Sequence, residues 1–317
     1  MKAYIIQRLL SLIPVMFVVA VVVFFIIHLT PGDPAAVILG PDASVEEVNH
    51  LREEMGLNLP IHEQFWNWIT KVVQGDLGWS IYMDKPVLQA FLENLAPTLS
   101  LALMAQIIAI LISIPAGIIA ATKRGTLTDQ TFMIVSLLGI SVPNFLLALL
   151  LVLVFAINFA LLPVAGFQPL SNGILPHLQY LILPAFALGA IQAALIARVT
   201  RSSMLDVLHA NYIKTARSKG VKKKVVIFKH ALKNAFIPIL TVIGQTFGQL
   251  IAGAVVIETV FNIPGIGQLI INAIMRRDFE VIQGTILLIA FSYVIINLIV
   301  DLLYGFFDPR VRLSAKN

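Results

Sequence analysis

Long apolar runs separated by shorter polar segments dominate the chain. About 20 predominantly apolar residues are enough for a helix to cross the hydrocarbon core of a bilayer. Six stretches reach that length, at residues 9–29, 97–121, 131–161, 179–199, 234–260 and 281–305. The pattern therefore predicts an all-α membrane protein with six transmembrane helices.

The third and the first of these runs need a closer interpretation. The third is too long for one straight crossing, and it contains Pro143 followed by Asn144. Because proline lacks an amide hydrogen and clashes with the preceding helical turn, we expect a kink or a tilted helix there. The first run follows Lys2 and Arg8, but it is longer than the apolar region of a secretory signal and no small-residue cleavage site follows it. We therefore expect an uncleaved first span.

Composition agrees with residence in a membrane. Hydrophobic residues make up 58% of the chain and charged residues only 12%, with a mean hydropathy of +0.90. A soluble domain carries about 25% charged residues, so this chain has too few charges to cover a surface that faces water. A disordered chain and a compact cytosolic enzyme are both excluded. The absence of cysteine excludes disulfides, thiolate nucleophiles and cysteine-ligated metals.

The basic residues predict the orientation. Lys and Arg favour the cytoplasmic side of a membrane protein. If the N-terminus is cytoplasmic, the external segments hold only five of the 22 basic residues, namely Arg52, Lys71, Lys85, Arg276 and Arg277. Both termini are therefore predicted to be cytoplasmic. The net charge of +5 reflects this topology, and no nucleic-acid partner is expected.

The first external segment, residues 30–96, is rich in acids and has predicted structure of its own. Ser44 and Glu47 form a capping box, and Gly56 ends the helix that they open. A second helix begins near Pro60 and has an apolar stripe at helical spacing. The members of this stripe are Ile61, Phe65, Trp66, Trp68, Ile69 and Val72. Two interpretations are compatible: a small helical cap packed on the bundle, and a surface that receives a soluble partner.

Motifs for catalysis are missing from the sequence. It has no G-x-x-x-x-G-K-[ST] phosphate loop, so the chain is not expected to hydrolyse ATP by itself. It also has no G-x-S-x-G nucleophile elbow and no H-E-x-x-H zinc motif. The six histidines are scattered singly, without the spacing of metal ligands. We therefore predict a protein that is not an enzyme, with no catalytic residue and no metal site.

Polar side chains within the spans are almost all neutral. Ionisable groups in the membrane mark many ion-coupled transporters, and only Glu258 and Asp301 come near the spans, at ends that interfacial water is expected to reach. The neutral groups are Gln106, Ser113, Ser141, Asn144, Gln192, Gln245 and Gln249. Ser141, Asn144, Gln245 and Gln249 are candidates for lining a translocation path. Packing of hydrogen-bonded amides between helices is the alternative.

The longest cytoplasmic segment, residues 200–233, is strongly basic. It contains many Lys and Arg residues and a single acid, Asp206. One interpretation is that the segment lies on anionic lipid. Apolar residues from Met204 to Ala216 fall at helical spacing, so we expect the helix to continue below the membrane. Gly220 interrupts it, and a second helical segment follows from Lys222 to Asn234. A helix, glycine turn and helix of this kind can insert into a cleft on another protein.

This segment resembles the EAA loop of permease subunits of ABC importers, whose pattern is E-A-A-x3-G-x9-I-x-L-P. Ala216, Gly220 and Leu232 match, whereas Lys214, Thr215, His230 and Lys233 replace the glutamate, first alanine, isoleucine and proline. These departures fit the dipeptide/oligopeptide/nickel permease family, whose members read like Y-x-x-T-A-R-x-K-G followed by H-A-L. The residues that the resemblance assigns to ATPase coupling are Tyr212, Thr215, Ala216, Arg217, Gly220, His230 and Leu232.

Further landmarks extend this resemblance along the whole chain. They are PGDP at 31–34, QGDLGWS at 74–80, SVPNF at 141–145, ILP at 182–184, VFNIPGIG at 260–267 and DPR at 308–310. The resemblance implies a type I ABC-importer permease fold. The expected domains are a first span (1–29), an extracytoplasmic helical segment (30–96), a core permease domain (97–310, with the coupling loop 200–233) and a cytoplasmic tail (311–317).

The implied function is that of a transport subunit in the cytoplasmic (inner) membrane of a bacterium or archaeon. It would form half of the path for short peptides, beside a second homologous permease, two ABC ATPase subunits and an extracytoplasmic solute-binding protein. The chain itself would bind no cofactor, since ATP and Mg²⁺ are used by the ATPases, and membrane lipids would surround it. Glutathione or nickel chelates are alternative substrates of the same machinery. A self-sufficient secondary transporter and a lipid-binding scaffold are the competing functions.

Overall fold

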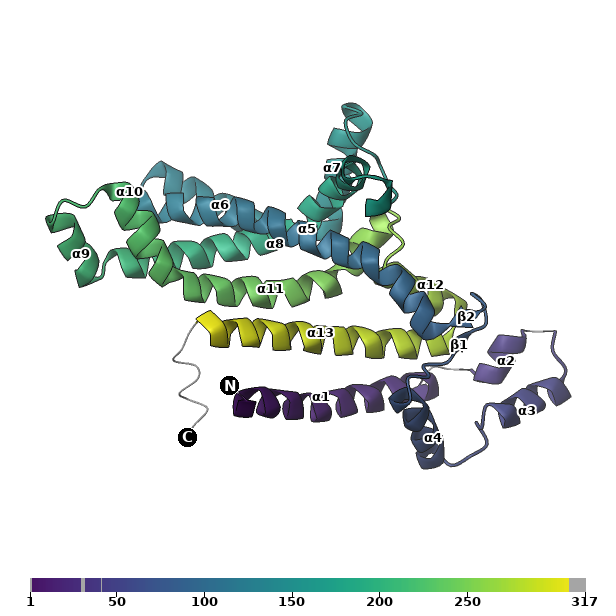
Figure 1. Ribbon diagram of the computed structural model, residues 1–317. Helices are drawn as coiled ribbons and strands as arrows, with labels where there is room; N and C mark the ends of the chain where they lie inside the picture. Colours follow the sequence, from purple (N-terminus) through teal and green to yellow (C-terminus); the bar gives the residue numbers. More distant parts are fainter. Residues whose placement is uncertain (1, 30–31, 41, 308–317) are drawn as a thin grey trace.

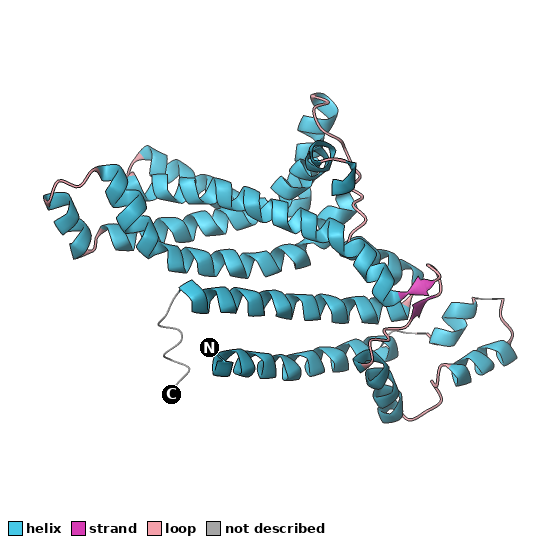
Figure 2. Cartoon of the chain, in the orientation of Figure 1, coloured by secondary structure: helices cyan, strands magenta, loops and turns pink. Residues whose placement is uncertain are grey.

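The computed structural model describes residues 2–29, 32–40 and 42–307. The helices are α1 (Lys2–Leu29), α2 (Pro34–Leu39), α3 (Val45–Glu54), α4 (Ile61–Val73), α5 (Val87–Thr122), α6 (Leu127–Ser141), α7 (Asn144–Leu151), η1 (Val152–Asn158), η2 (Leu170–Asn172), α8 (Ile174–Leu208), α9 (Asn211–Ser218), α10 (Lys223–Val225), η3 (Val226–Leu232), α11 (Lys233–Val260), α12 (Ile266–Arg276) and α13 (Phe279–Phe307). Strands β1 (Trp79–Ser80) and β2 (Lys85–Pro86) pair as a short antiparallel hairpin. Helix dominates the described chain, as Figure 2 shows, and the all-α prediction is confirmed.

Long helices lie side by side and form a bundle (Figure 1). Within the described residues, four helical segments are long and apolar enough to cross a membrane, at Val87–Thr122, Ile174–Leu208, Lys223–Val260 and Phe279–Val300. A bent pair, Leu127–Ser141 with Asn144–Asn158, is a fifth candidate, and α1 contains the shorter apolar helix Leu10–Ile26 among its described side chains. These six segments fall where the apolar runs of the sequence predict them. The start of α1 and the end of α13 lie at the same end of the bundle as α9, as the predicted topology requires.

The third apolar run is broken more sharply than a kink. Helices α6 and α7 meet at 103°, and α7 points away from the bundle axis (Figure 1). Val142 and Pro143 both have extended backbones, with ψ angles of 122° and 139°. Pro143 disfavours a helical conformation at the residue before it and cannot donate to the preceding turn, so α6 ends there. The run therefore forms two separate helices at a sharp angle, and not the single kinked or tilted helix that the sequence predicts.

Helices α5 and α8 run parallel to each other and touch at their backbones. A Cβ atom added to Gly189 would lie 2.6 Å from the carbonyl oxygen of Ala105, and one added to Gly117 would lie 2.7 Å from that of Ala197. Small residues at such contacts allow helices in a membrane to approach closely. Residues of α5, α8 and α11 contribute to the largest apolar cluster among the described residues, around Leu101, Leu188 and Leu250.

The external segment forms a helical cap on α1, at the end of the bundle opposite α9 (Figure 1). Its predicted capping box is present, and hydrogen bonds from the backbone and hydroxyl of Ser44 hold the pKa of Glu47 below its usual value. In α4, Phe65 and Trp68 pack on Phe24 of α1, with ring centroids 5.2 and 5.7 Å apart. Trp66 is 65% exposed. The apolar stripe therefore holds the cap on the bundle, and one aromatic ring stays available at the surface.

The contact between α5 and α8 predicts the effect of one methyl group. Gly189→Ala forces that methyl into a backbone carbonyl, and overpacking of this kind destabilises a protein by roughly 1–3 kcal/mol. The matched control is Gly139→Ala, because a Cβ atom there would lie an ordinary 3.5 Å from Ala194 of the same helix α8. We expect Gly189→Ala to lower the melting temperature of the purified protein and Gly139→Ala to leave it unchanged or raise it. Equal melting temperatures for the two variants would contradict the close contact.

Candidate functional site

The loop between α8 and α11, residues 209–232, extends the bundle beyond the ends of the other long helices (Figure 1). The sequence predicts a helix that continues from α8 through Ala216, and this is wrong, because α8 ends at Leu208 and α9 starts at Asn211. Ala210 is extended, with a ψ of 147°. A ring nitrogen of His209 lies 2.6 Å from the carbonyl oxygen of Leu205, so a side chain satisfies one of the terminal carbonyls of α8.

One buried side chain anchors α9. Ile213 is 0% exposed and belongs to an apolar cluster with Met204 of α8, Val226 of η3 and Ile239 of α11. The other residues of α9 are exposed or half-buried. A short helix with a single buried anchor is held in a fixed position while most of its surface stays free to contact another molecule.

The turn after α9 is a Schellman motif. Gly220 has a φ of +73°, its amide donates to the carbonyl of Arg217 over 2.9 Å, and the amide of Val221 donates to that of Ala216 over 3.2 Å. This pair of hydrogen bonds satisfies the last carbonyls of the helix and needs a left-handed residue at its centre. Glycine adopts that conformation without strain. The sequence pattern A-x3-G therefore has a local structural cause here.

The structure separates the predicted coupling residues into two groups. Tyr212, Thr215, Arg217 and Gly220 are exposed on α9 and its turn, with Ala216 half-buried beside them. The other two, His230 and Leu232, are half-buried in η3, the returning arm of the loop. Leu232 packs against the cluster around Ile213. The first group is accessible to a partner, whereas the second lies in the arm of the loop that returns to the bundle.

The predicted path residues lie on three helices, α6, α7 and α11. Ser141 and Asn144 flank the break between α6 and α7, where the Ser141 hydroxyl donates to the Leu137 carbonyl over 2.8 Å. Asn144 has a buried side-chain oxygen without a hydrogen-bond partner. Gln245 and Gln249 are exposed on α11. Across the described residues, no hydrogen bond joins one pair to the other.

A second set of polar groups lies inside the bundle. Gln106 of α5, Gln192 of α8 and Thr246 of α11 are buried, and the Thr246 hydroxyl is 3.5 Å from the side-chain oxygen of Gln106. The side-chain nitrogen of Gln106 and the oxygen of Gln192 have no hydrogen-bond partner. The sequence pattern identifies both amides as polar groups within spans but gives no sign that they are buried between three helices.

Glu258 has a different position from the expected one. It was predicted near a span end within reach of interfacial water, but it is fully buried. It accepts hydrogen bonds from the Thr98 hydroxyl over 2.5 Å, the Gly267 amide over 2.7 Å and the Gln268 amide over 3.2 Å. The carboxylate thus holds the N-terminus of α12, where backbone amides favour a negative group. Side chains from Asp301 onward, including the other predicted acid, lie outside the described residues.

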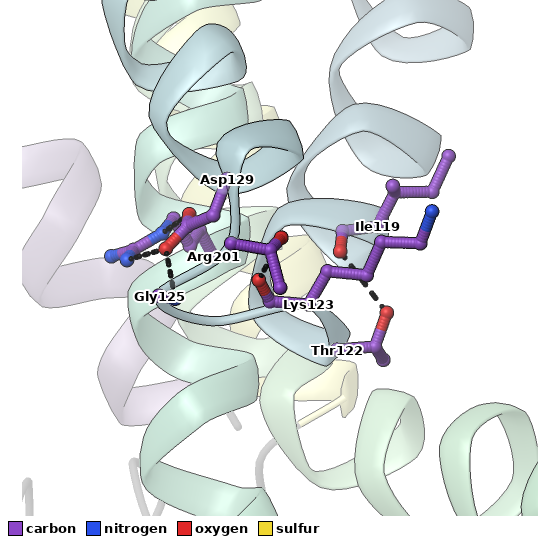
Figure 3. Close-up of polar contacts among 7 residues, drawn as sticks. Ile119, Thr122, Lys123, Gly125, Asp129 and Arg201 are labelled. Atoms are coloured by element: carbon purple, nitrogen blue, oxygen red, sulfur yellow. Dashed lines mark hydrogen bonds and ion pairs between the residues drawn. The ribbon is translucent and has the colours of Figure 1, made fainter.

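Asp129 and Arg201 form an ion pair that the sequence pattern does not reveal (Figure 3). The guanidinium of Arg201 donates to both carboxylate oxygens of Asp129, over 2.6 and 2.8 Å, and the amide of Gly125 donates to one of them over 3.0 Å. Asp129 is only 4% exposed. Two parallel bonds from one guanidinium are strong and directional. The pair therefore fixes the turn between α5 and α6 to α8, shortly before α8 ends in the loop.

Comparison with known proteins identifies the class of protein. The family model of the binding-protein-dependent transport system inner membrane component matches residues 113–313, and the model of the N-terminal part of such membrane components matches residues 1–102. The chain therefore belongs to this family, the permease subunits of ABC importers. It is a multi-pass inner membrane protein and a transport subunit, not an enzyme. ATPase and binding-protein partners follow from the family in general.

Individual relatives extend over nearly the whole chain. The chain is 45% identical to a probable peptide ABC transporter permease, y4tP of Sinorhizobium fredii, over 98% of its own length and 100% of that protein. It is 42% identical to the glutathione transport system permease GsiC of Escherichia coli K12, over 98% and 99% of the two chains. A chain of the MetNI methionine ABC transporter shares the fold at 16% identity, with a TM-score of 0.58, over 70% of this chain and 97% of that one.

The ion pair predicts a coupled effect on stability. Asp129→Asn and Arg201→Gln should each lower the melting temperature, because each leaves a partner charge in a poorly hydrated site. The double variant should be little worse than either single one, since hydrogen bonds to charged groups contribute about 1.5–3 kcal/mol that is lost only once. Thermal unfolding of the purified single and double variants measures this coupling. Fully additive losses would show that the two residues act independently.

Proposed function

We propose that this chain forms half of an ATP-driven import path and that α9 with its turn transmits force from an ATPase subunit. The geometry of the loop carries this proposal. Its exposed face holds Tyr212 and Thr215, while Ile213 fixes α9 to the bundle. A contact that transmits motion must be accessible on one side and rigidly attached on the other, and α9 meets both requirements.

The attachment of the loop supports a rigid-body mechanism. The cluster around Ile213 contains Ala109 of α5, Ile196 of α8 and Ile239 of α11, so a push on α9 reaches three membrane helices at once. The ion pair of Asp129 with Arg201 adds α6 to the same unit. When the ATPases close on ATP, displacement of two such loops would rock the two halves of the path between inward-open and outward-open states.

A second permease is supported by the exposure of Gln245 and Gln249. Both amides lie within the long apolar helix α11, and both are exposed in the single chain. Amides facing lipid would lose hydrogen bonds to water without replacement, which is costly in a membrane. A homologous chain that covers this face would enclose the two amides between the subunits. A path shared by two chains is therefore the arrangement that these residues favour.

Short peptides are the proposed substrates, delivered by a solute-binding protein outside the membrane. The two named relatives of this chain are a probable peptide permease and a glutathione permease. Glutathione is itself a small peptide, so it remains the second candidate. Neutral amides on α11 suit a polar solute that must be bound weakly and released, because they offer hydrogen bonds without a fixed charge. A secondary transporter is disfavoured by family membership.

The turn at Gly220 gives the test. Gly220→Val places a β-branched residue in a left-handed conformation, which costs roughly 1–2 kcal/mol and distorts the contact face. Its matched control is Gly75→Val, because Gly75 also has a positive φ (+88°) with open space around it but follows α4 in the external cap. In vesicles containing the complete transporter, we expect ATP-dependent dipeptide uptake to fall at least about tenfold for Gly220→Val, which corresponds to 1.4 kcal/mol or more of lost coupling.

Uptake of a labelled dipeptide and of glutathione should be measured in parallel on the same vesicles. The control variant should retain uptake, and both variants should be inserted at the level of the unmodified chain. Wild-type uptake by Gly220→Val would contradict the coupling role. Uptake of glutathione but not of dipeptides would leave that role intact and overturn the choice of substrate.

A further inference from the structure

A hollow of about 540 Å³ lies between the α8–α11 loop and the ends of α5 and α8. Three cations line it: Arg124 from the turn after α5, Arg217 from α9 and Lys223 from α10. Apolar side chains form the rest of its wall, among them Leu205, Leu208, Val221, Val226 and Ile227. We call this feature the basic hollow. It brings Arg124 together with two cations of the α8–α11 loop, which is distant from Arg124 in the sequence.

Among the described residues, no carboxylate neutralises the positive charge of the basic hollow. Its lining contains no Asp or Glu, and within the described part of the chain no ion pair joins Arg124, Arg217 or Lys223 to a carboxylate. Arg124 does act on Asp129 through space, but that carboxylate is already engaged by Arg201. Three unpaired cations around one hollow attract an anion, and guanidinium groups match a phosphate particularly well.

The position of the basic hollow identifies the anion. Arg124 lies two residues after Thr122, the last residue of the membrane helix α5, so we expect the hollow at the level of the headgroups of the cytoplasmic leaflet. Its wall combines cations with apolar side chains, which suits a molecule that is both charged and apolar. Basic pockets between helices at this level are typical binding sites for anionic lipid headgroups. A water molecule occupies about 30 Å³ in the liquid, so the hollow has ample room for a phosphoglycerol group.

We propose that the basic hollow binds the phosphate headgroup of an anionic phospholipid, such as phosphatidylglycerol or cardiolipin, from the cytoplasmic leaflet. A bound phosphate would join α9 and α10 to the turn between α5 and α6. That turn is the one fixed to α8 by Asp129. The lipid would therefore hold the loop against the bundle and limit the movement of α9 relative to α5 and α8.

The test compares two triple variants that each remove three positive charges. The first variant removes the three positive charges of the basic hollow by Arg124→Gln, Arg217→Gln and Lys223→Gln. The second replaces exposed lysines of the same loop that do not line the hollow, namely Lys214→Gln, Lys219→Gln and Lys224→Gln. The assembled transporter is purified in mild detergent, and the phospholipid retained by each variant is measured by native mass spectrometry. We expect the first to retain at least about tenfold less anionic lipid than the second and the unmodified chain.

A second measurement does not depend on variants. Delipidated unmodified transporter is titrated with phosphatidylglycerol, cardiolipin or phosphatidylcholine, and its melting temperature is followed. A ligand that binds the folded state raises this temperature, so only the two anionic lipids should do so. Stabilisation by phosphatidylcholine to the same degree would overturn the proposal.

Three further results of the comparison would also overturn the proposal. They are equal loss of lipid by both triple variants, unchanged retention by both, and loss of an ATPase subunit by the first variant while its lipid remains. The last result would assign the hollow to a protein partner. None of these measurements uses ATP or a peptide, so their failure is distinguishable from failure of the proposed transport function.

Discussion

The backbone contact between α5 and α8 is the constraint on which the remaining structure depends. Lipid chains are as apolar as leucine, so membrane helices associate through close packing and paired polar groups instead of the hydrophobic effect. Gly117 and Gly189 allow this packing, and the buried polar groups Gln106, Gln192 and Thr246 lie on or beside the two helices. Helices α6, α7 and α11 pack on this pair, and α13 contacts α5 and also α1, which carries the cap.

The same contact bears on how the proposed coupling loop would act on the proposed path inside the membrane. Helix α8 continues past the ion pair with Asp129 to Leu208, and the cluster around Ile213 then secures α9. At the opposite end, the carboxylate of Glu258 joins α11 to the start of α12. Both ends of the bundle are therefore fixed by a buried carboxylate that pairs with specific donors. Motion of α9 should accordingly displace whole helices and not bend them locally.

Features with local causes could be predicted from the sequence, and features that depend on distant partners could not. The six apolar runs, the Ser44 capping box and the turn at Gly220 each depend on residues within one segment. Asp129 and Arg201 are separated by 72 positions, and Glu258 and Thr98 by 160, so no local pattern marks either pair. In the sequence, Glu258 lies near the end of an apolar run, as an interfacial acid would. In the structure, the start of α12 packs over it and buries it. The break at Pro143 was predicted as a kink because sequence alone gives no angle.

Because the chain has no cysteine, a single introduced cysteine can report directly whether α9 contacts an ATPase subunit. A photoreactive maleimide can be attached to Thr215→Cys on α9 or, as a control, to Met275→Cys on α12, which is 80% exposed at the opposite end of the bundle. In the assembled transporter, we expect the probe on α9 to crosslink to an ATPase subunit and the probe on α12 to give no such crosslink. Peptide transport that proceeds normally without any crosslink between α9 and an ATPase would contradict the coupling role of α9.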